Sequence, residues 1–564
     1  MDPSTKTTIL DPSHIETLIE NGNAIVIYNK IVFKLDSWLR HHPGGDKTIL
    51  HFVGRDATDQ INAFHSEETR KSMLRYQIGI IDRKWDNIIP PIQRASDGKN
   101  VLQIVHDRQE YDSESRASSR ASSIFEPSGL RSRNAGTESP ISSISSFSED
   151  SLKLACDTKE GKEDALYDMN KSTEMDDDAI VASFRQLIIK LEAQGLYDCN
   201  YWAYLTEVIR ILSIGTIMLL LLHFQQYVLS AITLGTFWHP HDAGHLGITH
   251  SYSIDTFIGL LVSSTLGGLS LSWWKKSHNI HHLTTNFPSH DPDIQHLPFL
   301  AITPSFFSSL YSTYYARIMP YTPFAESMMR RQQWLYYPLL CFGRFNLYAL
   351  SWEHLFLDQG PRNRNMWWHR PFEILGQGVF WYWFGYLLLM RSLPSWGIRV
   401  AYVVISHAVT MPLHVQFTLS HFAMSTSPSP SSSSSSFSPS SIRNEQEERG
   451  SEREALNESW PHHQLRTTMD VACPPWLDWF HGGLQFQAIH HLFPRLPRHN
   501  LRAASEVVKE WAKEVGLRYE VYGWVECNGR VLSRLEEVGR QAGMLREAQR
   551  RVVEEGEWRR GVWE

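Results

Sequence analysis

Histidines gather in three short motifs whose spacing suits a metal site. "HDAGH" begins at position 241, "HNIHH" at 278 and "QAIHH" at 487, so the polar residues that start and end each motif lie three or four residues apart. If each motif is helical, these side chains project from one face. Imidazole-rich sites suit iron, copper, nickel or zinc, and seven histidines exceed what one ion normally takes. The motifs therefore predict a site for two metal ions, and they contain His241, His245, His278, His281, His282, Gln487, His490 and His491.

A second pattern, near the N-terminus, predicts a haem site. "WLRHHPGGDKTIL" places His42 directly before a Pro-Gly-Gly turn, and His65 follows Phe64 in "INAFHS". A haem that passes single electrons benefits from two imidazole ligands, which keep its iron six-coordinate in both oxidation states. We therefore expect His42 and His65 to be the axial ligands of the haem iron, in preference to the neighbouring His41 and His51.

Five apolar runs follow residue 184, at 203–223, 224–238, 256–274, 371–390 and 396–413. A helix needs about 20 residues to cross a bilayer, so the first run and the last two can span it, while the other two are marginal. The histidine motifs flank these runs, and ionisable groups beside membrane segments are functional by default. Runs one and two can form one hairpin and runs four and five another, with 256–274 as an interfacial or re-entrant segment. About four transmembrane helices would then bring all three motifs to one face of the membrane.

Composition divides the chain into segments. The N-terminal residues lack the basic and apolar regions of a signal peptide, so the first domain and the motif-bearing face are expected in the cytosol. The net charge of -7 gives no reason to expect a nucleic-acid partner, and five scattered cysteines suggest neither a disulfide framework nor a cysteine metal site. The expected parts are a folded haem domain at 10–84, a disordered Ser-rich tether at 96–178, a membrane domain at 184–522 with a disordered insert at 425–459, and a solvated or amphipathic tail at 523–564.

These motifs together resemble a known family. The His-Pro-Gly-Gly turn and the downstream histidine are similar to the cytochrome b5 domain, and the rest resembles the membrane-bound desaturases that carry an N-terminal cytochrome b5. In this "front-end" group glutamine replaces the first histidine of the third motif, as Gln487 does here. "HDAGHLGITH" and "DPDIQH" look most like the fungal enzymes that desaturate the sphingoid base of ceramides at carbon 8. The resemblance implies an α+β cytochrome b5-like haem domain followed by an all-α multi-spanning membrane desaturase domain.

The resemblance also implies cofactors and residue roles. It implies haem b, two iron ions held by the histidines of the three motifs, and dioxygen as co-substrate. Gln487 would be a weak or water-mediated ligand. His421 resembles an additional ligand found between the last membrane helix and the third motif; a structural role is the alternative, and His414 shares its helical face. Asp242 and Asp293 would orient ligating imidazoles, or else be solvated loop acids.

Partners and location follow from the same resemblance. We expect a membrane lipid substrate, either ceramide or an acyl lipid, and an NADH-cytochrome b5 reductase as the electron source. The expected location is the endoplasmic reticulum membrane, with the haem domain and the histidine motifs facing the cytosol. Fusing the electron donor to the acceptor would raise their effective concentration, to the order of millimolar for a flexible linker.

Other functions fit part of the pattern. A cytochrome b5-fused lipid hydroxylase could use the same oxidant, and a front-end fatty-acyl desaturase of the delta-6 type could act on another lipid. A haem carrier or metal transporter is the non-enzymatic alternative, although a transporter should bury polar residues within its crossings, whereas these motifs lie at the ends. The chain also departs from the family at "FWHPHDAGH", where a shortened apolar stretch would displace His241 and His245.

Overall fold

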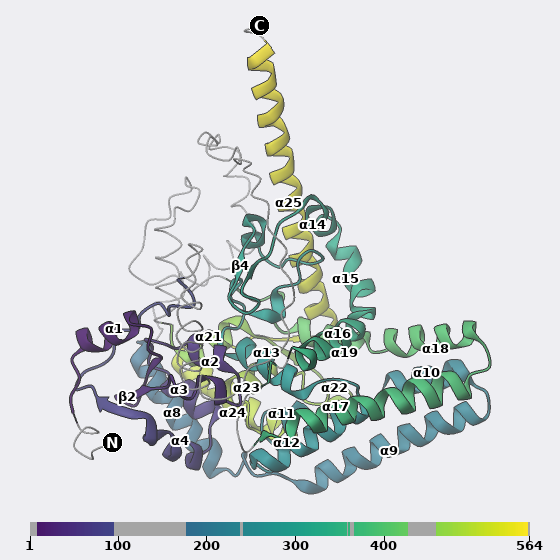
Figure 1. Ribbon diagram of the computed structural model, residues 1–564, viewed down its shortest axis with the longest axis horizontal. Helices are drawn as coiled ribbons and strands as arrows, with labels where there is room; N and C mark the ends of the chain where they lie inside the picture. Colours follow the sequence, from purple (N-terminus) through teal and green to yellow (C-terminus); the bar gives the residue numbers. More distant parts are fainter. Residues whose placement is uncertain are drawn as a thin grey trace, which may run out of the picture.

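The computed structural model describes residues 8–94, 176–236, 241–357, 359–360, 366–426 and 458–561. The tether expected at 96–178 and the insert expected at 425–459 lie outside these ranges, apart from a few residues at their edges. Figure 1 shows a small N-terminal unit in purple, a central body beside it, and an arm of helices that extends from the body.

The N-terminal unit is an antiparallel sheet surrounded by short helices. Asn29 and Lys30 both have positive φ, which is the two-residue turn whose twist matches a β-hairpin. Buried Trp85 donates a hydrogen bond from Nε1 to the carbonyl of Gly54 (2.8 Å), so the unit continues past its expected end at residue 84. The sheet order is β1-β2-β3. The elements are α1 (Pro12–Glu20), β1 (Ile25–Tyr28), β2 (Ile31–Lys34), η2 (Leu39–His41), α2 (Asp46–Leu50), α3 (Thr58–Phe64), α4 (Glu67–Met73), η3 (Leu74–Tyr76) and β3 (Gln77–Ile80).

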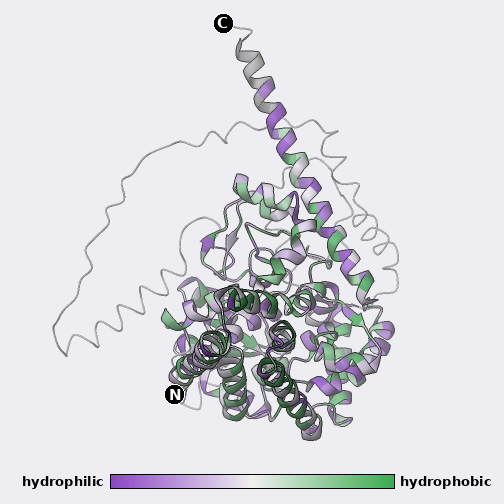
Figure 2. Cartoon of the chain, turned by 90° about the vertical axis from the view of Figure 1, so that its right-hand side faces the viewer, coloured by the Kyte–Doolittle hydropathy of each residue, from purple (hydrophilic) through white to green (hydrophobic). Residues whose placement is uncertain are grey.

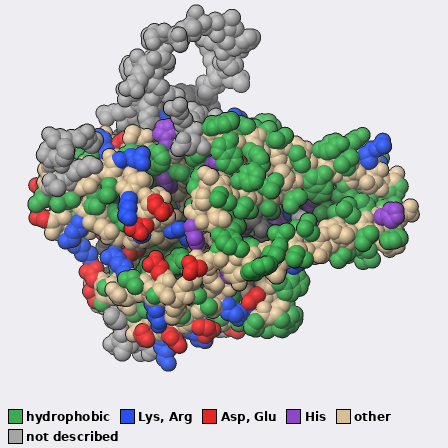
Figure 3. All heavy atoms as spheres, turned by 90° about the horizontal axis from the view of Figure 1, so that it is seen from below, with side chains coloured by type: hydrophobic (Ala, Val, Ile, Leu, Met, Phe, Trp, Pro, Cys, Tyr) green, Lys and Arg blue, Asp and Glu red, His purple; other side chains and the backbone are tan. Residues whose placement is uncertain are grey.

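The arm is built from long apolar helices. Large apolar side chains such as Leu212, Leu219 and Val400 are exposed on its outer faces. Its helices are green in Figure 2, and Figure 3 shows apolar side chains covering the arm while most charges lie elsewhere on that face. Apolar surface of this extent requires an apolar surrounding. The elements are α9 (Tyr201–His223), α10 (Tyr227–Gly235), α17 (His369–Phe380), η10 (Trp381–Ser392), α18 (Trp396–Ala408) and α19 (Met411–Leu419).

The number of candidate membrane spans is lower than expected. Within the described ranges, two helical segments are long and apolar enough to cross a membrane, Tyr201–His223 and Trp396–Leu419. A bent pair of helices provides a third candidate. The expectation of about four crossings is therefore met only in part. The second apolar run forms just the nine residues of α10, and the stretch from α17 into η10 mixes apolar side chains with Glu373, Gln377 and several tyrosines and tryptophans.

The bent pair has a local cause. It consists of α12 (Tyr252–Leu260) and η6 (Leu261–Leu266), followed by α13 (Leu271–Leu283), with a bend of 114° between the two halves. Gly268 has φ +66°, and a Cβ at this position would lie 2.5 Å from the ring of Phe380, so glycine is required there. The side chain of Ser270 then caps α13 by accepting a hydrogen bond from the amide of Trp273. The bend turns α13, which carries the second histidine motif, away from the direction of α12.

The body is mainly helical but also contains two small sheets. Strand β6 (Asp470–Ala472) pairs in parallel with β7 (Val521–Gly523), and β4 (Tyr311–Ser312) pairs antiparallel with β5 (Arg317–Ile318). The all-α domain that the resemblance implies is therefore not purely α-helical: β6 and β7 join segments distant in sequence, and β4 and β5 form a local hairpin. Its other helices are α8 (Asp177–Ala193), α11 (His241–Gly244), η7 (Pro292–Ile294), η8 (Pro304–Ser308), α14 (Pro323–Met329), α15 (Gln332–Cys341), α16 (Gly343–Phe356), α21 (Trp460–Thr467), η11 (Pro475–Leu477), α22 (Asp478–His481), α23 (Gln487–Leu492), η12 (Arg498–Asn500), α24 (Leu501–Val515) and α25 (Trp524–Gly561).

The C-terminal helix corrects an expected domain boundary. Residues 523–564 were expected to form a tail, but the first half of α25 is buried in the body. Val531, Leu535 and Val538 are at most 1% exposed and pack in the same core as Phe306, Met329 and Leu419, because they form one apolar face of the helix. The boundary expected at 522 therefore falls inside a core.

The N-terminal unit contacts the body through buried polar groups. The ring centroids of His51 and His290 lie 5.1 Å apart, and both side chains lie within hydrogen-bond distance of the Thr313 hydroxyl. Burial, together with the neighbouring charges of Lys47 and Arg55, holds the pKa of His51 well below its usual value. Burial likewise lowers the pKa of His290 to about 4. Both imidazoles are therefore neutral at physiological pH.

This contact should weaken in acid. Protonation of buried His290 is disfavoured, so the stability from its neutral form is complete above pH 6.5 and falls as the pH drops towards about 4. The loss would reach about 3 kcal/mol, at roughly 1.4 kcal/mol per pKa unit. We expect the thermal unfolding midpoint of the wild type to fall more steeply with acidification than that of a His51→Gln, His290→Gln double variant. Exposed His14 provides the control, and a His14→Gln variant that also flattened the curve would contradict this origin.

Candidate metal and haem sites

The three histidine motifs meet at one place in the body. α13 carries the second motif and α23 the third, while His245 directly follows α11. The rings lie in two groups of buried or partly buried imidazoles, and in each group one nitrogen of every ring lies within 4.8 Å of the corresponding nitrogens of the others. We call these clusters A and B. Cluster A consists of His245, His278, His282 and His490, and cluster B of His281, His421 and His491.

Cluster A has the spacing of ligands that share an ion. The Nε2 atoms of His278 and His282 are 3.1 Å apart. Two nitrogens bound to one metal at about 2 Å lie about 3 Å apart when the bonds are near right angles. Trp274 stacks on His278 with ring centroids 4.5 Å apart. A Cβ at Gly244 would lie 2.0 Å from the Trp274 ring, so only glycine fits before His245.

Cluster B is oriented by hydrogen bonds on the outer side of each ring. Nδ1 of His281 is 3.0 Å from both carboxylate oxygens of Asp291, and Nδ1 of His491 is 2.9 Å from Oε1 of Gln464. Nδ1 of His421 faces the carbonyl of Thr467 at 3.4 Å. Because Nδ1 is engaged in all three rings, Nε2 remains as the ligand atom. The buried Nε2 of His491 has no hydrogen-bond partner within the described structure, which fits a metal ligand.

The electrostatics favour metal binding. Burial and neighbouring imidazoles hold the pKa values of His421 and His491 well below the usual histidine value. Neutral imidazoles keep the lone pair that a metal requires. The two clusters adjoin, since the rings of His282 and His491 stack with centroids 4.1 Å apart. Nitrogen donors of this kind, divided four and three, fit two transition-metal ions such as iron.

Other predicted residues lie around the clusters. The side chain of His241 is outside the described structure, as are residues 237–240 of the shortened stretch. Gln487 is buried and lines a cavity of about 10 Å³ together with His490 and Arg498, which is the size of one water molecule. His414 is separate from both clusters, and its Nδ1 donates to the carbonyl of Leu340 at 2.8 Å.

The two acids for which an orienting role or a solvated position was expected have different contacts. Asp293 is 42% exposed, and its carboxylate lies 3.8 Å from Nδ1 of His278 and 3.9 Å from Nδ1 of His281. Asp242 forms a 2.7 Å ion pair with Nε of Arg498 and accepts a hydrogen bond from the hydroxyl of Tyr204. This ion pair ties the first motif to the segment that follows the third.

Sequence reasoning missed the residues that hold the ligands. Asp291 is fully buried and also accepts hydrogen bonds from the amides of Asn286 and Asp293, so its carboxylate is fixed. Gln464 donates from Nε2 to the carbonyl of His282 while its Oε1 meets His491, and so it contacts both clusters. "HDPD" offered two acids without indicating which one faces inward, and no spacing pattern pointed to Gln464.

Asn286 connects further segments around cluster B. Its Nδ2 donates to the carbonyls of His421 (2.9 Å), Ser425 (3.3 Å) and Thr467 (3.3 Å). It adopts φ +59°, a left-handed conformation that asparagine tolerates better than most residues. One amide thus holds the chain on both sides of residues 427–457.

The predicted haem ligands face each other in the N-terminal unit. The rings of His42 and His65 have centroids 6.1 Å apart. Nδ1 of His42 bonds the carbonyl of Gly45 (2.9 Å) and Nδ1 of His65 that of Ile61 (3.1 Å), which leaves both Nε2 atoms available. Two imidazoles that share an iron through bonds of about 2 Å have centroids about 6 Å apart. The geometry therefore fits a haem with two histidine ligands. His41 is exposed, and His51 lies in the contact with the body.

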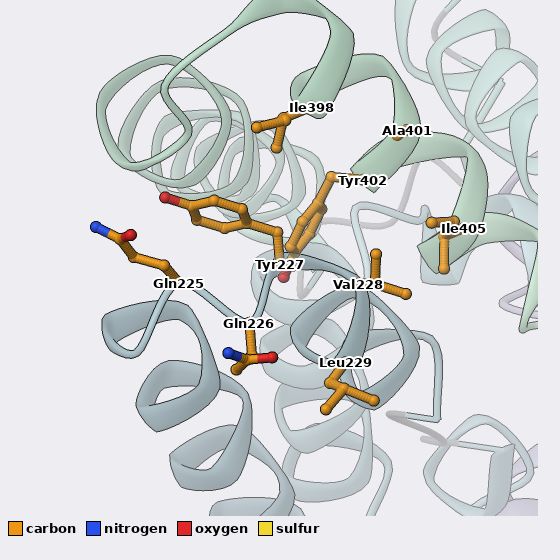
Figure 4. A pocket seen from close by; sticks show the side chains of 9 residues that line it. All are labelled: Gln225, Gln226, Tyr227, Val228, Leu229, Ile398, Ala401, Tyr402 and Ile405. Atoms are coloured by element: carbon orange, nitrogen blue, oxygen red, sulfur yellow. The ribbon is translucent and has the colours of Figure 1, made fainter.

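A cavity in the described part of the chain is lined by residues that belong to none of these sites. It has a volume of about 250 Å³ and lies between the turn from α9 to α10 and helix α18, as Figure 4 shows. Residues 225–229 line one side, and Ile398, Ala401, Tyr402 and Ile405 line the other. No member of either cluster reaches it, so it is not the reaction site.

The bond between Asp291 and His281 should control metal retention. We expect Asp291→Asn to weaken metal binding about 10- to 100-fold, as is typical when a carboxylate partner of a ligating imidazole is lost. Metal retained against increasing chelator, measured by mass spectrometry of the metal, provides the test. Asp293→Asn is the matched control because Asp293 is partly exposed and more distant. Equal losses in the two variants would contradict the orienting role of Asp291.

The membership of cluster B predicts metal stoichiometry. His421→Ala removes one of its three imidazoles, so we expect bound metal to fall from two ions per chain towards one. His414→Ala should leave the metal content unchanged, since its Nδ1 serves a backbone carbonyl. Elemental analysis of the purified variants measures both. Loss of metal only in the His414→Ala variant would show that His414, and not His421, is the metal ligand.

The chain is similar to known proteins along most of its length. The family profile named "Fatty acid desaturase" matches residues 218–523, and the profile named "Cytochrome b5-like Heme/Steroid binding domain" matches residues 12–82. A Delta 8-(E)-sphingolipid desaturase of Emericella nidulans is 45% identical, with 99% of each chain covered. One from Candida albicans is 40% identical, covering 97% of this chain and 98% of the relative. A Delta(8)-fatty-acid desaturase 2 of Arabidopsis thaliana is 34% identical, covering 91% and 89%. The expected resemblance is thus confirmed: the chain belongs to the fatty acid desaturase family of oxidoreductases and carries a cytochrome b5-like haem domain ahead of its helical desaturase domain.

Proposed function

We propose that the chain introduces a double bond at carbon 8 of the sphingoid base of ceramides, using dioxygen and electrons that pass through its own haem domain. The observation that carries the reaction is the pair of adjoining imidazole clusters beside an apolar helical arm. The fungal relatives named Delta 8-(E)-sphingolipid desaturases, matched over nearly their whole length, support the substrate and the position of the double bond.

The proposed ligand assignment follows the two clusters. One iron would be held by cluster A, to which we add His241 on the basis of its sequence motif, and the other by cluster B. Gln487 would act through a water molecule, which agrees with the small cavity that it shares with His490. Asp291 and Gln464 would keep the imidazoles of cluster B in position.

The reaction requires these metals because acidic and basic side chains cannot break unactivated C–H bonds. Two bound irons, with dioxygen and electrons, supply an oxidant that can. The reaction removes one hydrogen from each of two adjacent carbons, and two electrons and two protons complete the reduction of dioxygen to two waters. The protein's own task is to keep the imidazoles neutral and converging, and to exclude bulk water from the clusters, most of whose residues are buried.

Electrons would arrive through the haem domain. His42 and His65 would hold haem b, and their two ring nitrogens would keep its iron six-coordinate. An NADH-cytochrome b5 reductase would reduce this haem, one electron at a time. The cytochrome b5-like profile and the paired Nε2 atoms support this route.

We propose that the arm lies in the endoplasmic reticulum membrane, with the haem domain and both clusters on its cytosolic face. Three crossings would be made by α9, α17 continued by η10, and α18 continued by α19, and the second apolar run at 224–238, of which α10 is a part, would supply the fourth. The exposed apolar side chains along the arm support this arrangement. The bent pair formed by α12, η6 and α13 would enter and leave on the same side.

A fatty acid is the second candidate substrate, because the plant relatives carry the name Delta(8)-fatty-acid desaturase. Such an enzyme would act on an acyl chain rather than on the sphingoid base, with the same oxidant and the same ligands. Lipid analysis separates the two substrates.

The test is expression of the chain in a yeast strain that lacks sphingolipid 8-desaturase activity, followed by mass spectrometry that locates double bonds. We expect a new carbon-8 double bond in sphingoid bases. His281→Ala should abolish it, since it removes a member of cluster B, whereas the exposed His14→Ala should preserve it.

Other products would change the conclusion. A double bond found only in fatty acids would identify an acyl lipid as the substrate. A hydroxylated sphingoid base would identify the reaction as hydroxylation. Unsaturated product that persists in the His281→Ala variant would remove the cluster from the mechanism.

A further inference from the structure

The haem domain touches the metal clusters through one aromatic side chain. Phe64 ends α3 and immediately precedes the haem ligand His65. Its ring lies edge-on to the ring of His282, with centroids 5.8 Å apart and an interplanar angle of 86°. His282 belongs to cluster A and stacks on His491 of cluster B at 4.1 Å. The backbone thus joins the haem ligand to Phe64, and a line of rings leads from Phe64 through His282 to the place where the clusters adjoin.

We propose that Phe64 is the bridge for electrons between the haem and the metal pair, and that the haem domain is held in one fixed position on the body so that this bridge is maintained. This inference rests on the proposed function, since it assumes haem and two metals at the sites described above. It adds a positioning residue and an interaction surface to that function.

Reciprocal packing supports the fixed position. Phe64 belongs to the haem domain but packs against the core of the body that contains Leu492 and Phe493. Leu283 follows His282 in α13 and packs against that core and also against the core of the haem domain. Phe64 adjoins a haem ligand, Leu283 adjoins a histidine of cluster A, and each packs into the neighbouring unit. This packing fixes the distance between the haem ligand and the cluster.

Polar contacts on other sides of the haem domain fix its orientation. The buried carboxylate of Asp59 in α3 pairs with Nε of Arg185 in α8 at 2.9 Å. Nζ of Lys47 donates to the carbonyl of Thr313 at 2.8 Å and also to that of Tyr314. Helices α2 and α3 are therefore both attached to the body, and a domain attached at several separate points cannot rotate about any one of them.

The electron balance of the step is simple. Each transfer oxidises the haem iron from ferrous to ferric and reduces one metal of the pair by one electron. Two transfers, with the haem reduced again by the reductase between them, supply the two electrons of one turnover. No bond forms or breaks at Phe64, and no proton moves. The rate of such a transfer falls steeply with the width of the gap, and a ring filling that gap shortens it.

The first test measures this transfer directly. The haem of purified, metal-loaded protein is reduced without oxygen, and its reoxidation by the ferric metal pair is followed by stopped-flow absorbance. Phe64→Leu keeps an apolar side chain but removes the ring, so we expect a slowing of roughly tenfold or more, as small misplacements of reacting groups produce. Phe64→Trp retains a ring and should stay within about twofold.

Control measurements separate a bridge from a structural role. Phe52→Leu makes the same change at a buried phenylalanine of the haem domain core, and should lower thermal stability without changing the transfer rate. The haem absorbance spectrum and midpoint potential of Phe64→Leu should equal those of the wild type. If Phe64→Leu and Phe64→Trp slow the transfer equally, or neither slows it, the bridge is refuted.

The second test concerns the fixed position. Arg185→Glu places a like charge beside Asp59, and Lys190→Glu makes the same change of charge at an exposed site on the same helix. We expect Arg185→Glu alone to slow haem reoxidation by roughly fivefold, the size of coupling typical of contacting residues, and to speed hydrogen exchange in α3. Equal behaviour of the two variants would show that the domain moves freely.

These outcomes are distinct from those of the proposed function. A chain that makes no double bond in lipids but reoxidises its haem rapidly through Phe64 would overturn the substrate and leave the bridge intact. If the wild-type chain makes the product and the Phe64→Leu variant transfers electrons at the wild-type rate, the bridge is refuted and the proposed function stands.

Discussion

Seven imidazoles gathered in one largely water-excluded place are the constraint on which the rest of the structure depends. Such rings cannot all be protonated at once, because burial and mutual repulsion disfavour several charges together, and a metal requires the neutral form at the nitrogen that it binds. Neutral rings also need an orientation, since only one nitrogen can face the metal. For cluster B, Asp291 supplies it from the loop after α13, and Gln464 and the carbonyl of Thr467 supply it from helix α21. The folding of the body around α13 and α23 can be understood as the means of bringing these segments together.

Helical spacing within a motif predicted which histidines come together but not their division into two clusters. Neighbouring residues on a helix point about 100° apart, so His281 and His282 face different clusters although they are adjacent in sequence. That division could have been deduced from helical geometry. The contact of Asp291 with His281 could not, because it depends on how the chain turns after α13. The haem pair was predictable because the turn at Gly44–Gly45 and the following helices are local features.

The structure differs most from the sequence-based expectations in two elements, α25 and α10, each of which was predicted from the character of a short stretch of sequence. The final residues of the chain are polar, which suggested a solvated tail, yet Val531, Leu535, Val538 and Ala542 form an apolar stripe of helical period in the first half of α25. Attention to that stripe would have placed the helix in the core. Conversely, an apolar run alone overestimated the length of α10, which ends after nine residues. Hydropathy predicts where a chain avoids water but not how long each helix is.

The three hydrogen bonds of the Asn286 side chain have a consequence for how this protein can vary. They hold the carbonyls of His421 and Ser425 on one side of residues 427–457 and that of Thr467 on the other. When the ends of a segment are tied, doubling the length between them costs only about 0.6 kcal/mol of closure free energy. The described ends of this segment are therefore tied to cluster B by the Asn286 side chain itself. The segment is a natural point at which to graft an affinity tag or a fluorescent reporter beside the reaction centre.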